Sequence, residues 1–261
     1  GAIDFIEKPV NIVYLKSSGF KDKFLDTLQA VVTSRQTNIA VSPIVTREKQ
    51  EENTQKLVNI VRKTKPTVAG QKIVALACST GGPKALQSVV PRLPAELAAP
   101  VLIVQHMPKG FTQSLAERLD SLSKIKVKEA AEGDVLENGV VYISMGGKHM
   151  NVATKGGRAT ITYTDEPPRE GVKPCANYMY ESLKTSSYAQ IVCVVLTGMG
   201  ADGTKGIVNL ETSKKIHVIA QDEASSTVYG MPKAIAATGL VNQVVALDDV
   251  AQEIIMNVGV R

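Results

Sequence analysis

The sequence has no tryptophan and few other aromatic residues, and this scarcity argues against one class of binding surface. Aromatic side chains make up 4% of the 261 residues. Proteins that hold single-stranded nucleic acid need aromatic platforms on which bases stack. The formal net charge of +5 is modest, and no stripe of Lys and Arg is interleaved with aromatic residues. We therefore expect no nucleic-acid partner.

Cysteine is also scarce, with residues only at Cys78, Cys175 and Cys193. An odd number of widely separated cysteines gives neither a disulfide framework nor the paired spacing of a metal site. We expect no metal, no cofactor and a reducing, cytoplasmic setting. No apolar run reaches the roughly 18 residues of a membrane-spanning helix, so no membrane insertion is predicted.

What the sequence does contain is a regular alternation of two patterns from residue 72 onward. Continuous apolar runs rich in Val and Ile predict strands, and they cover residues 72–77, 100–105, 190–196, 216–220 and 241–245. Helical patterns cover residues 83–91, 111–122, 203–213, 231–238 and 248–258. Buried strands alternating with helices are typical of an α/β fold, a doubly wound and mainly parallel sheet flanked by helices.

The middle of the chain has a different pattern. Short strands are expected near residues 126–129, 140–144, 150–153 and 158–164, separated by Asn-Gly and Gly-Gly pairs. Such pairs between short strands are typical of hairpins. We therefore predict an antiparallel hairpin region, inserted into the parallel sheet or added to its edge.

The N-terminal part divides into two further segments. Residues 1–9 have the pattern of a short strand, and helical spacing follows to about residue 33. The apolar signal then weakens, and residues 34–71 are predominantly basic towards their end, as in a linker. The predicted organisation is 1–33, a linker at 34–71, and a main domain at 72–261.

Three loops that leave predicted parallel strands carry unusual residues. They are Ser79-Thr80-Gly81-Gly82, Gln105-His106-Met107-Pro108-Lys109-Gly110, and Thr197-Gly198-Met199-Gly200-Ala201-Asp202-Gly203. The carboxyl ends of parallel strands share one edge of a sheet, where sites form. A serine becomes a nucleophile when a histidine takes its proton and a carboxylate orients that histidine. We predict Ser79, His106 and Asp202 for these roles.

Two alternatives compete with this hypothesis. Ser79 alone could be a helix N-cap, with the glycines only permitting a tight turn. The third loop also contains Gly198-x-Gly200-x-x-Gly203, followed by Asp222 at the spacing of a dinucleotide-binding fingerprint. Asp202 argues against this Rossmann-type alternative, because it would place a carboxylate where a pyrophosphate must bind.

The remaining histidines and Cys78 are weaker candidates. His217 lies within a predicted strand, where a histidine is more often structural. His149 follows a Gly-Gly-Lys turn and could line the rim of a cleft. Alternation along a strand points Cys78 and Ser79 to opposite faces, so Cys78 is expected to pack in the core.

Five separated motifs together resemble the chemotaxis protein-glutamate methylesterases. They are Ala77–Gly82, Gln105–Phe111, Lys148-His149-Met150, Leu196–Gly203, and Asp222–Ser225 with Gly230-Met231-Pro232. The similarity extends over about residues 72–247. It implies a doubly wound catalytic domain with a Ser79, His106 and Asp202 triad. It also implies hydrolysis of glutamate γ-methyl esters on the cytoplasmic helices of chemoreceptors and, in many members, deamidation of receptor glutamines.

For the oxyanion that such a reaction forms, we expect two backbone donors. The N–H of Thr80 follows the nucleophile directly, and the N–H of Met199 is the second candidate.

The resemblance also extends to the N-terminus. Members of this family carry a phosphoacceptor receiver domain, and residues 1–9 resemble its last strand, with the helix to residue 33 resembling its last helix. Residues 1–33 are accordingly predicted to be a receiver remnant, and the family implies a chemotaxis histidine kinase as partner through that domain. Two segments depart from the family pattern: Ala77-Cys78-Ser79 replaces Gly-Ala-Ser, and Lys173-Pro174-Cys175-Ala176-Asn177 replaces a basic residue followed by Pro-Ser-x-Asp.

Overall fold

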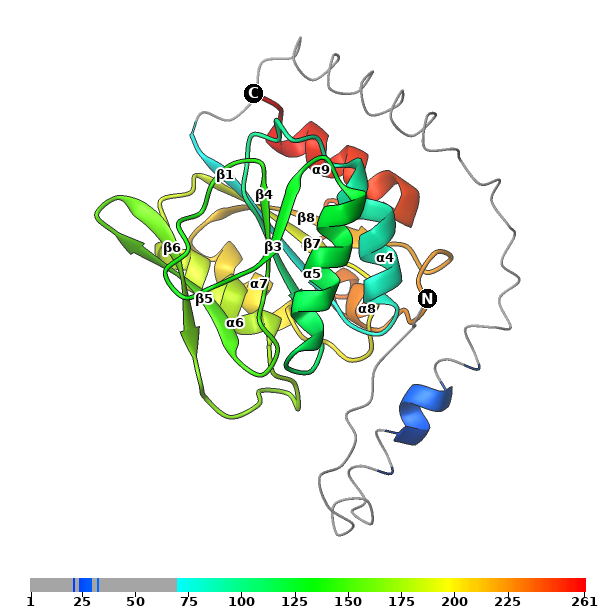
Figure 1. Cartoon of the computed structure of the whole chain (residues 1–261). Coiled ribbons are helices and arrows are strands. Elements are labelled where there is room, and N and C mark those ends of the chain that lie inside the picture. The colour runs from blue at the N-terminus through cyan, green and yellow to red at the C-terminus, as the bar shows by residue number, and fades with distance from the viewer. Residues whose placement is uncertain (1–20, 22–23, 30–31, 33–69) are drawn as a thin grey trace.

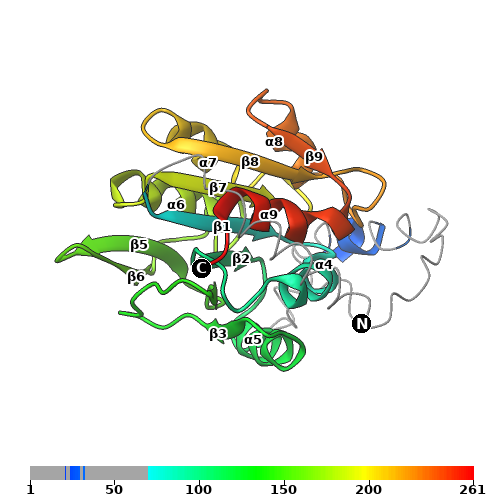
Figure 2. The same cartoon turned by 90° about the horizontal axis from the view of Figure 1, so that it is seen from above.

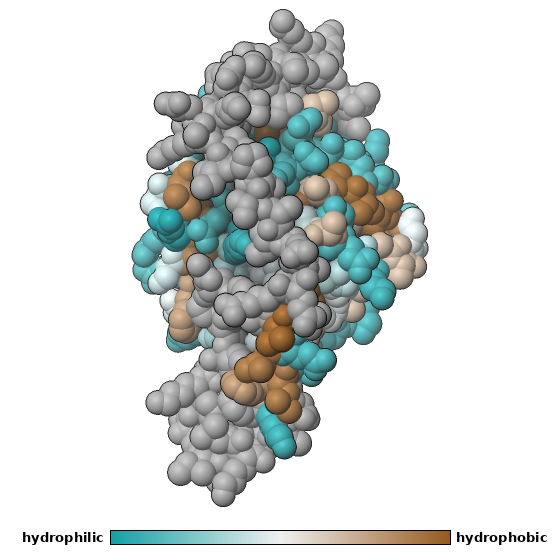
Figure 3. All heavy atoms as spheres, turned by 90° about the vertical axis from the view of Figure 1, so that its right-hand side faces the viewer, coloured by the Kyte–Doolittle hydropathy of each residue, from teal (hydrophilic) through white to brown (hydrophobic). Residues whose placement is uncertain are grey.

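The computed structural model of the chain describes residues 21, 24–29, 32 and 70–261. Most of the predicted receiver remnant and nearly all of the predicted linker lie outside these residues, so the division of the N-terminal part stays a prediction. The few residues described before residue 70 are helical. Apolar side chains among them, such as Phe24 and Leu28, are exposed. Brown, hydrophobic spheres lie in the lower part of the face drawn in Figure 3.

The main unit is built on one seven-stranded sheet in which every neighbouring pair of strands is parallel. The strand order is β3-β4-β2-β1-β7-β8-β9 (Figures 1 and 2). The strands are β1 (Lys72–Cys78), β2 (Val101–Gln105), β3 (Lys126–Glu129), β4 (Val140–Ile143), β7 (Gln190–Val195), β8 (Lys215–Gln221) and β9 (Gln243–Val245). The predicted α/β class with a mainly parallel sheet is confirmed.

Helices cover both faces of this sheet (Figure 2). One layer contains α4 (Gly82–Val89), α5 (Phe111–Leu122) and α9 (Val250–Val258). The other contains α6 (Ala176–Ser182), α7 (Thr204–Glu211) and α8 (Met231–Ala236). Short 3₁₀ turns follow α4 at Val90–Arg92 and α6 at Leu183–Thr185, and one precedes α9 at Leu247–Asp249.

The central strand β1 explains why two separate cores form. All seven of its residues are buried. Alternate side chains point to opposite faces of a strand, and Val74, Leu76 and Cys78 pack in the core that contains α4, α5 and α9. Ile73, Ala75 and Ala77 pack in the core that contains α6, α7 and α8. A continuous apolar run is therefore required here, because β1 has no face in contact with water.

The prediction that the short strands in the middle of the chain form antiparallel hairpins is wrong for the first two of them. The strands β3 and β4 are parallel to each other and form the edge of the main sheet. The Asn138-Gly139 pair lies in the connection that returns the chain to the start of β4, with Gly139 at φ 77° and its N–H donating to the carbonyl of Ala99. The pair forms a turn, as predicted, but it contacts a distant loop and does not join two antiparallel strands.

Only β5 (His149–Lys155) and β6 (Arg158–Thr164) form the predicted antiparallel hairpin. Gly156 and Gly157 close it with φ values of 57° and 78°, which favour glycine. This two-stranded sheet packs beside α6, with Met150 and Ile161 buried in the same core as Met179 of that helix. None of the helices in the described part of the chain has the length and apolar composition of a membrane-spanning helix.

Candidate active site

The three loops predicted to carry the site leave three neighbouring strands at the centre of the sheet. The strand β1 lies between β2 and β7. Cys78 pairs with Gln105, so Ser79 and His106 are the next residues on adjacent strands. The N–H of Ser79 donates to the carbonyl of Thr197 at 3.0 Å, which joins it to the third loop. From β1 the chain goes first to one side of the sheet and later to the other, a switch point of the kind at which α/β sheets bind ligands.

Ser79 stands at a sharp turn between β1 and α4. The turn closes through a 2.7 Å bond from the N–H of Gly82 to the carbonyl of Ser79. Gly81 has φ 81° and is the N-cap of α4, and no side chain caps this helix. The N-cap alternative for Ser79 is therefore wrong, and this half-buried residue does not cap the helix.

His106 and Asp202 are in direct contact. Their Nε2 and Oδ2 atoms are 2.7 Å apart, and the two side chains are only 10% and 4% exposed. Burial alone would raise the pKa of Asp202, but hydrogen bonds and the attraction of His106 outweigh it and lower that pKa below its ordinary value. Because Nε2 faces the carboxylate, Nδ1 is the ring nitrogen left to accept a proton.

Asp202 is held by donors from a segment that the sequence did not connect with it. The N–H of Ala176 donates to Oδ2 at 2.6 Å, and the N–H of Asn177 donates to Oδ1 at 3.1 Å. The thiol of Cys175 and the N–H of Gly203 also donate to Oδ1, at 3.0 and 2.8 Å. The carboxylate thus caps the start of α6 while it faces His106, and its orientation is fixed from five directions.

Two peptide units beside Ser79 have their carbonyl groups fixed. The carbonyl of Ser79 accepts from the N–H of Gly82 and from the side-chain amide of Gln105. The carbonyl of Gly198 accepts from the N–H groups of Gly230 and Met231 at 3.1 and 2.8 Å. In a trans peptide the N–H points opposite to the C=O. The N–H groups of Thr80 and Met199 are therefore held in fixed directions.

Gly198 is required for this close packing. A Cβ atom there would lie 2.4 Å from the sulfur of Met231 and 2.8 Å from the Cβ of Ser79. These distances are shorter than any van der Waals contact, so a side chain would displace the turn that carries Ser79. The third loop can approach the serine only because this residue is glycine.

The other histidines are structural. His149 is fully buried, so the expectation that it lines a cleft rim is wrong. Its Nδ1 accepts from the N–H of Cys175 at 3.2 Å and its Nε2 donates to the carbonyl of Pro167 at 3.2 Å. Burial lowers its pKa, which favours the neutral ring that these two bonds require. The ring of His217 bonds to Gln243 on the neighbouring strand.

The cysteines are buried free thiols. Cys78 donates to the side-chain oxygen of Gln105 at 3.1 Å, and burial raises its pKa. Its side chain packs in the core that contains α4, α5 and α9, as predicted. Burial and the neighbouring Asp202 carboxylate raise the pKa of Cys175 to about 12, so this thiol is a hydrogen-bond donor rather than a nucleophile.

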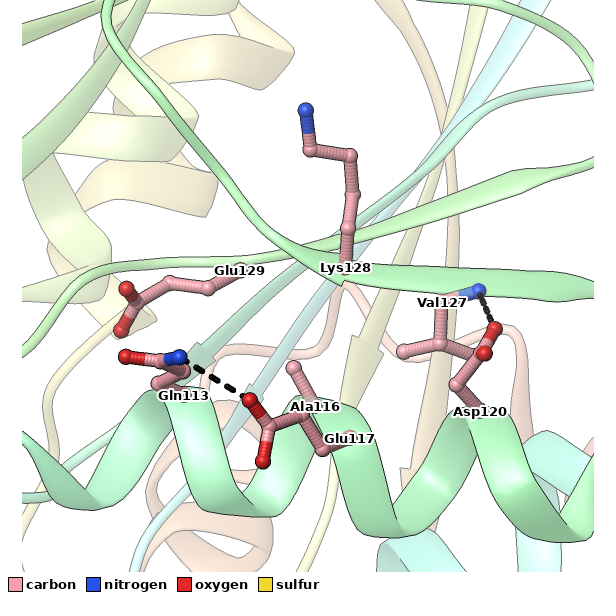
Figure 4. A pocket seen from close by; sticks show the side chains of 7 residues that line it. All are labelled: Gln113, Ala116, Glu117, Asp120, Val127, Lys128 and Glu129. Carbon is pink, nitrogen blue, oxygen red and sulfur yellow. Dashed lines mark hydrogen bonds between the residues drawn. The ribbon is translucent and has the colours of Figure 1, made fainter.

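A separate groove of about 350 Å³ lies between α5 and β3 (Figure 4). Its polar groups already have partners: Gln113 donates to Glu117, Asp120 accepts from the N–H of Val127, and Glu129 accepts from Thr112. Lys128 points away from the helix (Figure 4). Its ammonium group pairs with Asp134. The groove contains neither Ser79 nor His106. Among the residues that the structure describes, no His, Cys, Asp and Glu side chains are grouped as metal ligands.

Comparison with known proteins decides the family. The sequence model of the CheB methylesterase family matches residues 74–254. The chain belongs to this family. CheB methylesterase relatives include the "Protein-glutamate methylesterase/protein-glutamine glutaminase" of Geobacillus kaustophilus, 39% identical over 99% of this chain and 71% of that protein. The protein of the same name from Bacillus subtilis is 41% identical over 97% of this chain and 70% of its own length.

A solved structure supports the same assignment. The crystal structure of the Thermotoga maritima CheB methylesterase catalytic domain is similar with a TM-score of 0.68 and 36% sequence identity. The similarity covers 72% of this chain and 98% of that chain. The family resemblance inferred from the five motifs is thereby confirmed.

The dinucleotide-binding alternative is not supported. The first glycine of the fingerprint, Gly198, is packed closely against Ser79 and Met231. The anion at this turn is the protein's own carboxylate, Asp202, which accepts from the N–H of Gly203. Asp222 accepts a local hydrogen bond from the N–H of Ser225 at 3.0 Å.

Proposed function

We propose that the chain hydrolyses the γ-methyl esters of glutamate residues on chemoreceptors and deamidates receptor glutamines. The observation that carries this proposal is the 2.7 Å bond between His106 and Asp202, next to a serine on a glycine-bounded turn. Family membership supports the same reaction, because the relatives are named for both activities. The two reactions share one chemistry, since each replaces the leaving group of a side-chain carbonyl by water.

In the first half of the reaction, Ser79 Oγ attacks the γ-carbonyl of the substrate and its proton passes to Nδ1 of His106. The carbonyl π electrons move to the oxygen, which becomes an oxyanion. Asp202 holds the ring by Nε2 and stabilises its charged form. The tetrahedral intermediate then collapses, the C–O bond to methoxide breaks, and His106 returns the proton to give methanol.

In the second half, water attacks the acyl-enzyme while His106 accepts one of its protons. In the collapse of the second intermediate the bond to Ser79 Oγ breaks and His106 returns its proton to Ser79. The product leaves as a carboxylic acid, which loses its remaining proton to water. With a glutamine substrate the leaving group is ammonia in place of methanol. Neither the ester hydrolysis nor the deamidation, as written, needs a cofactor or a metal.

The N–H groups of Thr80 and Met199 are the proposed oxyanion donors. Support comes from the two carbonyl groups on the far side of their peptide units, which are each held by two hydrogen bonds. Donors fixed in advance stabilise a developing charge without reorganising, and removing one such donor typically costs roughly 10²–10³ in rate.

The biological setting follows from the family and is part of the proposal. The substrates are methyl-accepting chemoreceptors, and the reaction occurs in the cytoplasm on their cytoplasmic helices. A chemotaxis histidine kinase would act through a receiver domain, of which residues 1–33 are the proposed remnant.

The test is a methanol-release assay with a chemoreceptor cytoplasmic fragment carrying glutamate γ-methyl esters. Wild-type protein should release methanol, and Ser79→Ala should release none above the uncatalysed rate while its melting temperature stays unchanged. Near-normal release by Ser79→Ala would refute the assigned nucleophile, whereas no release by wild-type protein would refute the proposed reaction itself.

A further inference from the structure

Gln105 is a fully buried amide at the carboxyl end of β2, directly beneath the turn that carries Ser79. Its Nε2 donates to two carbonyl oxygens, that of Ser79 at 3.1 Å and that of His106 at 2.9 Å. Its Oε1 accepts from the thiol of Cys78 at 3.1 Å. Every polar atom of the amide therefore has a partner, and the two N–H bonds go to the backbones of the proposed nucleophile and base.

The bond to Ser79 has a consequence for the proposed oxyanion donor. The carbonyl of Ser79 and the N–H of Thr80 belong to one planar peptide unit. The hydrogen bond from Gln105 to the carbonyl oxygen of Ser79 fixes the rotation of this peptide plane. The N–H of Thr80 then points away from Gln105. The N–H of Gly82 also bonds this carbonyl, but it lies in the same turn and moves with it. Gln105 is the partner that ties the plane to a different strand.

The packing leaves this amide no freedom. A Cβ atom on Gly82 would lie 1.9 Å from Oε1 of Gln105, so the turn rests directly on the amide. A buried side chain with all its hydrogen bonds made stays in one orientation, because each alternative would strand a donor or acceptor away from water.

We propose that Gln105 is a positioning residue, which aims the Thr80 N–H at the oxyanion and sets the spacing between the backbones of Ser79 and His106. This inference rests on the proposed function. Gln105 does not touch the substrate, so its loss should leave substrate binding intact and weaken transition-state stabilisation. A displacement of about 1 Å in a catalytic group can cost roughly 10² in rate.

The experiment compares Gln105→Met, which keeps the length of the side chain and removes the amide, with wild-type protein. The substrate is a peptide with a glutamate γ-methyl ester, and the inhibitor is a matching peptide with a boronic acid at the position of the γ-carbonyl. We expect kcat to fall about 10- to 100-fold with KM within about twofold, and the boronate Ki to rise by a similar factor. A purely structural role would change the melting temperature without this joint change in kcat and Ki.

Gln105→Glu provides a second, pH-dependent readout. An ionised carboxylate would face the carbonyl oxygens of Ser79 and His106 and repel them, whereas a protonated one can donate one of the two lost bonds. The activity of this variant relative to wild type should therefore rise as the pH is lowered. A ratio that is independent of pH would contradict the proposed hydrogen bonds.

Tyr142→Phe is the matched control for stability. It also removes a buried polar group, a hydroxyl that donates to the carbonyl of Val135 and accepts from the N–H of Glu137, outside the site. It should lower the melting temperature and leave kcat unchanged. If Gln105→Met retains full kcat while wild-type protein is active, the positioning role is wrong. If wild-type protein itself is inactive on the ester, the failure lies with the proposed function.

Discussion

Replacing Asp202 by asparagine should disturb the tautomer of His106, and therefore kcat, much more than it disturbs the fold. The carboxylate faces His106 and the N–H of Ala176 through Oδ2, and three other donors through Oδ1. An asparagine keeps the most bonds if its carbonyl oxygen takes the Oδ1 position. The NH₂ group then faces Nε2 of His106 and forces that nitrogen to accept.

In this tautomer His106 can no longer act as the general base. With Nε2 accepting, the proton of the neutral ring moves to Nδ1, which can no longer take the proton of Ser79. The comparable change in a serine protease lowers kcat by about 10⁴-fold, and we expect a loss of roughly 10³- to 10⁴-fold here. Methanol release under saturating substrate measures it.

The same substitution has a cost in stability. The asparagine NH₂ would meet the N–H of Ala176 where the oxygen now accepts at 2.6 Å, and a buried unsatisfied donor costs about 1–3 kcal/mol. The pKa of Asp202 is lowered in the folded state. Its contribution is therefore fully present above the unfolded pKa of about 3.9 and is lost as the pH falls through the folded pKa. The difference in unfolding free energy between wild type and Asp202→Asn should shrink below about pH 4.

Urea unfolding at several pH values measures this difference, with Asp134→Asn as control. Asp134 also accepts a backbone N–H and pairs with a lysine, but it lies outside the site. Asp134→Asn should retain normal kcat. Normal kcat in Asp202→Asn would refute the assigned role of this carboxylate, and a stability difference that grows at low pH would contradict the direction of its pKa shift.

Two further predictions concern the packing around the site. Gly198→Ala should lower both kcat and the free energy of unfolding, the latter by about 1–3 kcal/mol, because the new Cβ would lie 2.8 Å from the Cβ of Ser79. Steady-state kinetics and urea unfolding measure the two effects. A variant with wild-type kcat and wild-type stability would refute the close contact. Cys175→Ser should keep kcat within a few-fold of wild type, since a hydroxyl can donate to Asp202 as the thiol does. Cys175→Val removes that donor and should lower kcat, and equal activity of the two variants would show that the bond is unimportant.

The sequence contained most of the information about the parallel sheet, because each buried strand shows itself as a continuous apolar run. It located β3 and β4 but predicted the wrong direction of pairing, since an Asn-Gly pair is typical of a hairpin and its actual partner, Ala99, is distant in the chain. The direction of a short edge strand is decided by what its connection packs against, and local spacing carries no signal for that.

The site shows the same division. The strand-end loops predicted where Ser79, His106 and Asp202 would lie, and the structure brings the second and third into contact. The sequence did not reveal that Cys175 and the start of α6 hold Asp202, because these donors lie about 26 residues away. The sequence also did not indicate that the side chain of Gln105 bonds to the carbonyl of Ser79, although Gln105 directly precedes His106. A buried amide becomes interpretable only when its partners are known.

Rapid-quench mass spectrometry of the acyl-enzyme shows which residue is the nucleophile. Wild-type protein is mixed with a peptide carrying a glutamate γ-methyl ester, quenched in acid, digested and mapped. We expect a transient adduct, equal in mass to the peptide minus methanol, on the fragment that contains Ser79, and none in Ser79→Ala. An adduct on any other residue, or full turnover by Ser79→Ala, would contradict it.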